Sequence, residues 1–242
     1  MATARTVPTP PTRPPEADPA AGLVRNAAPI RIPAGAATHA GFRAWATSDE
    51  FPRGLKATFL GDEIILDMSP EELETHSVVK VEVGRVIPNL VRELNLGIFY
   101  GDGAFVTNEA AELSTEPDAT FVSKASFRAG RVRLVPREGV EGQSMEILGT
   151  PDWVLEIVSR YSVRKDTKEL RVKYHRAGIP EYWLVDARGP EISFQILRRQ
   201  RDDYVAVALR GGWQRSRVFG RAFRLDRERD DLNFWRYTLA VK

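Results

Sequence analysis

The region 152–189 restricts the fold more than any other part of the chain, because a strand, a helix and a second strand follow one another directly. The segments 152–159 (DWVLEIVS) and 181–189 (EYWLVDARG) have the Val and Leu content of buried strands. The helix between them runs from about residue 163 to 177 and ends at Gly178, the usual residue type after a helix. Strands and helices that alternate in this way are typical of one α/β domain.

Two acids interrupt the apolar strand at 152–159. Because alternate residues of a strand share a face, Asp152, Val154, Glu156 and Val158 should lie together on one face. Glu156 then lies in mid-strand between apolar neighbours, where an ionised carboxylate is costly unless a cation or hydrogen-bond donors compensate. A second acid, Asp118, opens another apolar strand, EPDATFVS.

Carboxylates on two adjacent strands could converge on one divalent cation. Mg²⁺ takes oxygen ligands and keeps several waters, so two carboxylates and a backbone carbonyl are sufficient protein ligands. In the alternative interpretation, Glu156 pairs with a structural arginine and Asp118 caps a turn. Spacing alone leaves both open, because structural ion pairs are common.

The other elements follow from periodicity and turn signals. We expect a short helix at 38–50, paired strands at 55–60 and 63–68, and a long helix from 69 to 95 that Ser69 caps and Pro70 enters. We also expect a strand, turn and strand at 97–108, an irregular charged excursion at 131–147 and a hairpin at 191–209. Residues 223–242 give no clear pattern.

Composition separates the chain into two parts. Residues 1–36 are rich in Pro and Ala and should form a disordered leader, whereas 37–242 should form the folded domain. The chain has no cysteine, which excludes disulfides, thiolate zinc sites and cysteine nucleophiles and suits a reducing cytoplasm. No apolar run reaches the length of a membrane span. The net charge of +2 neither requires nor excludes a nucleic-acid partner.

Three segments, EPDATFV, PDWVLEIVS and RKDTKELRVKYHRAGIPEYWLVD, resemble the bacterial Uma-two family, often labelled putative restriction endonucleases, of the PD-(D/E)XK nuclease-like superfamily. The resemblance covers roughly residues 40–200, and AGIPEYWLVD is its most specific part. It implies a restriction-endonuclease-like mixed sheet flanked by helices. It also implies an endonuclease that uses Mg²⁺ (or Mn²⁺) to hydrolyse phosphodiester bonds in nucleic acid, with DNA the expected substrate.

The resemblance assigns roles to particular residues. Asp118 matches the acid of the Pro-Asp motif, and Glu156 matches the acid of the Glu-X-Lys motif. The carbonyl of Ile157 would be a further metal ligand, whereas Asp152 resembles a strand-entry residue. His76 on the long helix would be a ligand or would orient one; its alternative is a partly exposed histidine without a role.

The chain departs from the family pattern at the catalytic lysine. Val158 occupies the motif position, and Leu170 occupies the position where relatives carry a compensating lysine on the next helix. Lys165 and Lys173 are the remaining candidates, and the RKDT pattern favours Lys165, although either could be a solvated surface lysine. These departures keep open a second function, namely a weak or inactive nucleic-acid-binding or regulatory module on the same fold.

Two further regions suggest partners. The segments 197–203 and 209–224 combine arginines with Trp213, Phe219 and Phe223, which suits either phosphate contact and base stacking or an ordinary strand with a solvated face. The aromatic residues near the C-terminus could supply area for a homodimer. These residues are Phe234, Trp235 and Tyr237.

Overall fold

The computed structural model describes residues 29–137 and 139–242. Most of the expected leader therefore lies outside the described residues. The compact unit begins at Pro33, and Ala36 is already buried in it. Among the described residues, no helix has the length and apolar character needed to cross a bilayer.

The central sheet contains the strand–helix–strand unit that the sequence predicts. β9 (Trp153–Ile157) and β10 (Glu181–Asp186) are parallel neighbours, and α4 (Leu170–Arg176) connects them. All other neighbours in the sheet are antiparallel, so the sheet is mixed. The strand order is β12-β11-β10-β9-β6-β3, where β12 is Tyr204–Ala206, β11 is Ser193–Arg199, β6 is Ala119–Ser123 and β3 is Gly97–Tyr100.

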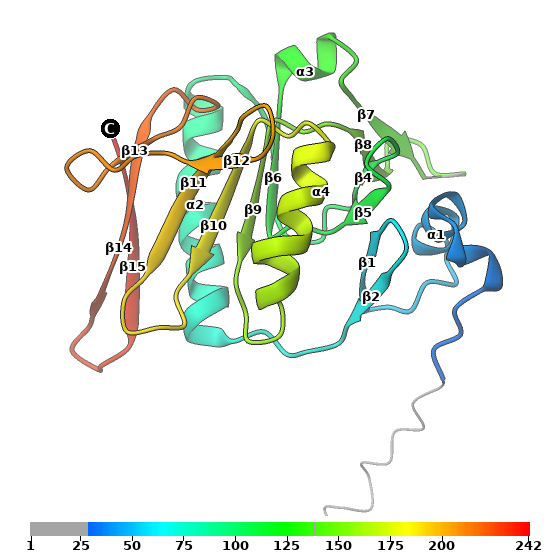
Figure 1. Ribbon diagram of the computed structural model, residues 1–242, viewed down its shortest axis with the longest axis horizontal. Coiled ribbons are helices and arrows are strands. Elements are labelled where there is room, and N and C mark those ends of the chain that lie inside the picture. The colour runs from blue at the N-terminus through cyan, green and yellow to red at the C-terminus, as the bar shows by residue number, and fades with distance from the viewer. Residues whose placement is uncertain (1–28, 138) are drawn as a thin grey trace, which may run out of the picture. The chain divides into compact units, whose positions relative to one another are not determined.

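Helices cover both faces of this sheet, with α2 (Val78–Glu93) on one side and α4 on the other (Figure 1). Trp153, Leu155 and Ile157 pack in the cluster that contains the apolar stripe of α2. Val154 packs instead with Leu170 and Tyr174. The alternation predicted for the strand at 152–159 is thus confirmed, and it turns the even-numbered residues towards α4.

Two further sheets, one of six strands and one of three, complete the unit. One has the order β2-β1-β5-β4-β8-β7, and α1 (His39–Ala46) packs Phe42 and Trp45 beside it. The other joins β13 (Gln214–Arg215), β14 (Ala222–Arg229) and β15 (Trp235–Val241) and adds apolar side chains to the core of α2. The remaining bounds are β1 Lys56–Leu60, β2 Ile64–Asp67, β4 Val106–Asn108, β5 Leu113–Thr115, α3 Lys124–Arg128, β7 Val132–Pro136 and β8 Ser144–Gly149.

Two local predictions were wrong. The long helix begins with a π-helical turn at Leu73–Ser77 rather than at residue 69, because Ser69 hydrogen-bonds with its amide and hydroxyl to Asp67 instead of capping the helix. The region 131–147 is not irregular but forms the antiparallel pair β7 and β8. Its charged residues fit an edge strand, which is where β7 lies. The strand, turn and strand expected at 97–108 are confirmed as β3 and β4, which belong to different sheets.

Candidate active site

The pairing of β6 with β9 sets the two predicted acids beside each other. Ala119 pairs with Leu155, so extending the antiparallel register by one residue places Asp118 opposite Glu156. Side chains of directly opposite residues point to the same face of a sheet. Both acids line one pocket of about 130 Å³, together with Ile157, His76 and Lys165.

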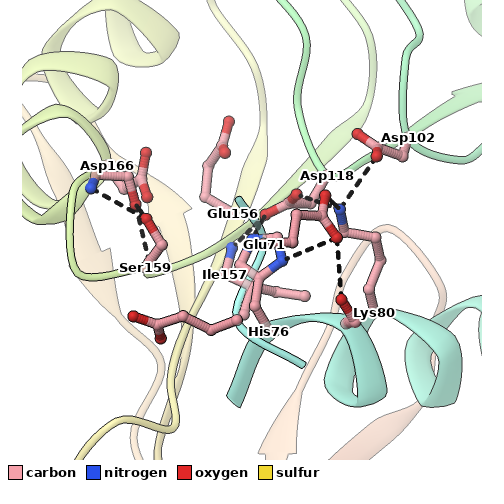
Figure 2. Close-up of polar contacts among 12 residues, drawn as sticks. Glu71, His76, Lys80, Asp102, Asp118, Glu156, Ile157, Ser159 and Asp166 are labelled. Carbon is pink, nitrogen blue, oxygen red and sulfur yellow. Dashed lines mark hydrogen bonds and ion pairs between the residues drawn. The ribbon is translucent and has the colours of Figure 1, made fainter. Parts of the chain in front are cut away.

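Asp118 is held as an anion by three donors (Figure 2). Its Oδ2 accepts a hydrogen bond from the amide of Ile157 at 2.7 Å and lies 3.3 Å from Nε2 of His76. Its Oδ1 lies 3.1 Å from Nζ of Lys80. Burial acts to raise the pKa of Asp118, but His76, Lys80 and the amide outweigh it and lower the pKa to about 2. Asp118 is therefore ionised over the ordinary pH range.

Glu156 has the opposite electrostatic environment. Its side chain is almost fully buried, and its Oε1 accepts a hydrogen bond from the hydroxyl of Tyr174 at 2.5 Å. Burial, and next the negative charge of Asp166, raise the pKa of Glu156 well above its usual range, although Lys165 opposes this. The carboxyl group therefore favours its protonated form unless additional positive charge enters the pocket.

Asp166 is a third buried acid, on the turn that precedes α4. Burial raises its pKa to about 6, with Lys165 acting in the opposite direction. Its Oδ1 is buried without a hydrogen-bond donor among the described residues, and Nζ of Lys165 lies 3.5 Å away. Burial lowers the pKa of Lys165, but Glu156, Asp166 and Asp118 together raise it, so Lys165 stays an ammonium.

The pocket as a whole is acidic. Six carboxyl groups line it, against two lysines and one histidine. They are Asp67, Glu71, Glu116, Asp118, Glu156 and Asp166. An excess of carboxyl groups over cationic side chains, together with a buried carboxylate oxygen that accepts no hydrogen bond, fits a hard divalent cation, which prefers oxygen ligands. In the described part of the chain, no cluster of three or more His, Asp or Glu side chains is close enough to form a cage, so the backbone carbonyl of Ile157 and water would complete the coordination.

Sequence reasoning missed Lys80, which contacts the predicted site directly. Besides Asp118, its Nζ lies 2.7 Å from Oε1 of Glu71 and 3.1 Å from Oδ2 of Asp102. The signal was available, because Lys80 follows His76 by four residues and so shares its face of the helix. Tyr174 and Asp166 were also missed. In the sequence, Tyr174 fits the apolar face of the helix, and Asp166 is only the neighbour of Lys165.

The two candidate lysines lie in different places. Lys165 lines the pocket, whereas Nζ of Lys173 donates to the carbonyl of Ala111 at 3.1 Å and Lys173 is not among the pocket residues. Val158 and Leu170 are fully buried. Asp152 accepts hydrogen bonds from the backbone amide of Ser123 and the hydroxyl of Ser126 at the edge of the strand, away from the pocket.

Comparison with known proteins identifies the chain's relatives. The family described as Uma2, putative restriction endonuclease, matches residues 40–228. A solved structure, that of a putative nuclease belonging to DUF820 from Anabaena variabilis ATCC 29413, is 18% identical, covers 68% of this chain and 83% of that chain, and superposes with a TM-score of 0.49. No curated protein matches.

Proposed function

Because the chain belongs to the Uma2 family of putative restriction endonucleases, we propose that it is a nuclease that hydrolyses phosphodiester bonds, in DNA, with Mg²⁺ or Mn²⁺ as cofactor. The observation that carries this proposal is the register of β6 and β9, which sets Asp118 and Glu156 side by side in one acidic pocket. Among residues 29–137 and 139–242, no arginine forms an ion pair with either acid, and their side-chain partners are Lys80, His76 and Tyr174.

The ion would be held by the carboxylates of Asp118 and Glu156 and by the carbonyl of Ile157. When bound, it lowers the pKa of a water molecule and neutralises charge on the phosphate. Glu156 must give up its proton to act as a ligand, because an ionised carboxylate supplies the negative charge that a cation requires. His76 orients Asp118 through its Nε2, as histidines beside ligating carboxylates commonly do.

Lys165 takes the role of the missing motif lysine. It is a half-buried ammonium that lines the same pocket, and its Nζ lies 3.5 Å from Oδ1 of Asp166. A cation fixed there before the reaction stabilises the negative charge that develops on the phosphate oxygens. Lys173 is the second candidate, and it would have to leave the Ala111 carbonyl to reach the pocket.

Cleavage of long single-stranded and duplex DNA, and of RNA, with Mg²⁺ or Mn²⁺ tests the proposal. Asp118→Asn and Glu156→Gln should each reduce the cleavage rate by at least a hundredfold. Lys165→Ala should lose most of the wild-type rate, whereas Lys173→Ala should retain most of it. Cleavage that survives both acid substitutions would exclude this pocket. Equal loss in the two lysine variants would leave the assignment of Lys165 without support.

A binding module without cleavage is the second candidate function. It is favoured by the buried apolar residues at the two family lysine positions, Val158 and Leu170. Asp118 is also already compensated by Lys80 and His76 without an ion. Nucleic-acid binding that persists in chelator, with no cleavage at high protein concentration after metal is added, would select this function.

Self-association is a separate proposal. Of the three C-terminal aromatic residues, Phe234 is exposed, Tyr237 is buried, and the ring of Trp235 lies under Arg227 and Arg229. Of these three aromatic residues, Phe234 is therefore the one whose ring is exposed to a partner. Gel filtration of the wild type and of Phe234→Ser tests a homodimer, which should dissociate in the variant.

A further inference from the structure

A groove of about 560 Å³ lies where β11, β12 and β13 meet. Its charge is opposite to that of the acidic pocket, because five cationic residues line it and no acidic residue does. They are Arg198, Arg210, Arg215, Arg217 and Lys242. All but Arg198 are exposed, and within residues 29–137 and 139–242 none of the five forms an ion pair with an acid. The positive charge is therefore available to a ligand.

Buried polar contacts hold the groove wall in place. Gln214 accepts a hydrogen bond from the amide of Ile196 at 2.9 Å and donates to the carbonyl of Phe194 at 2.7 Å, which fixes the segment of β13 against β11. The buried carboxylate of Glu181 accepts a hydrogen bond from the amide of Arg217 at 3.0 Å. Gln214 and Ser216 point inward, so Arg215 and Arg217 point out of the same segment.

Trp213 positions cations in this groove. Nζ of Lys242 lies 4.2 Å from the centre of its ring, and the guanidinium of Arg224 lies 5.0 Å from it. Such contacts stabilise a cation over an aromatic face. Because two cations already lie over the ring, Trp213 serves to hold positive charge rather than to stack on a base. The other two aromatic residues of this region, Phe219 and Phe223, are core residues.

The groove and the acidic pocket lie at opposite ends of the central strands. Glu156 is level with Leu184 and Gln195 in register, and Arg198 lies three residues further along β11. Standard strand dimensions put Arg198 about 10 Å along and about 10 Å across from Glu156. Figure 1 shows β12 and β13 together at this end of the sheet. Arg198 points to the same face of the sheet as Ile196, on the α2 side, whereas Glu156 points with Val154 to the α4 side. A nucleic acid that contacts both sites must therefore pass around the sheet and be longer than this separation.

We propose that this groove binds backbone phosphates of the nucleic acid, at a distance from the bond that is cleaved. The inference rests on the proposed function for the identity of the polymer, but the groove binds without a metal ion. Guanidinium groups recognise phosphates irrespective of base, so the contact is independent of sequence. It supplies affinity that the acidic pocket, which repels phosphates, does not supply.

The test measures binding of fluorescent 30-nucleotide single-stranded and 30-base-pair duplex DNA in chelator, by anisotropy, at several salt concentrations. The triple variant Arg210→Ala, Arg215→Ala and Arg217→Ala should bind at least tenfold more weakly. Its slope of log affinity against log salt should fall by about 2 to 3. Lysine at the same three positions should restore most of the affinity.

A matched variant controls for net charge. Arg92→Ala, Arg128→Ala and Arg133→Ala removes three exposed arginines outside the groove and should bind as the wild type does. Wild-type affinity and slope in the groove variant, or equal loss in the control, would overturn the inference. Loss of affinity in the control variant only would also overturn the inference, because it would place the DNA contact on another surface. Tight binding of polyglutamate without binding of DNA would overturn it as well, because it would assign the groove to an acidic protein. Glu156→Gln, assayed in parallel for cleavage, reports separately on the proposed function.

Discussion

Replacing Asp166 by asparagine should make the protein more stable at neutral pH. The pKa of Asp166 is raised from an ordinary 3.8 to about 6, chiefly by burial. A difference of about two pKa units corresponds to about 3 kcal/mol, at about 1.36 kcal/mol per unit. Because the folded-state pKa is the higher one, the favourable contribution is complete below pH 4, and it disappears as the pH rises through 6. Asparagine keeps the shape of the side chain and has no charge to bury.

Urea unfolding of the wild type and Asp166→Asn in chelator, from pH 4 to pH 8, measures this effect. The difference in free energy of unfolding should favour the variant increasingly as the pH rises, approaching about 3 kcal/mol at pH 7.5. The pKa of about 6 already includes the opposing effect of Lys165, so this figure is not reduced again for the ion pair. A variant that is less stable than the wild type at pH 7.5, or a difference that does not change with pH, would refute this electrostatic description of the pocket.

Three further substitutions test neighbouring contacts. Lys80→Ala should destabilise the protein by about 1.5 to 3 kcal/mol, since it removes the cation that Asp118 and Glu71 share. Thermal unfolding measures this, and Lys80→Arg should recover part of the loss. An unchanged unfolding midpoint in the alanine variant would contradict the contact. Tyr174→Phe should lower the free energy of unfolding by about 1 to 2 kcal/mol, because the hydroxyl that donates to buried Glu156 is lost. The matched control is Tyr204→Phe, which removes a hydroxyl that donates to the carbonyl of Ile179 and should lower the free energy by no more than this. Phe219→Ala should lower the free energy of unfolding by about 3 to 5 kcal/mol, because the ring of Phe219 packs against Trp153, Trp183 and Phe121. If the variant has wild-type stability but binds DNA more weakly, Phe219 would instead belong to a nucleic-acid contact.

The sequence allowed the central unit to be predicted because its signals are local. Alternation in 152–159 gave the correct faces of β9, and Gly178 marked the end of the helix that returns to β10. Charged residues obscured the hairpin of β7 and β8, because an edge strand tolerates exposed charges that resemble a loop pattern. The two strands of 97–108 were predicted, but the sequence did not show which strands pair with them, because β3 pairs with β6 and β4 pairs with β5 and β8.

The site was predictable in its acids and not in their charge states. Asp118 and Glu156 stand out because acids are rarely buried, and these two lie within or directly before an apolar strand. Which of the two is ionised depends on Lys80 and Asp166, and tertiary packing alone brings these side chains to the pocket. The positive groove likewise depends on the folding of β13 against β11, which turns Arg215 and Arg217 outward while Phe219 and Phe223 enter the core.

The central claim is that Asp118 and Glu156 share one cation. It is tested most directly by X-ray diffraction from crystals soaked in Mn²⁺, with data collected to show the anomalous scattering of the metal. The account predicts one peak within about 2.3 Å of a carboxylate oxygen of both Asp118 and Glu156 in the wild type, and none in Glu156→Gln. A peak that contacts only one of these acids, or no peak between them at saturating Mn²⁺, would contradict the claim that the two acids share a cation.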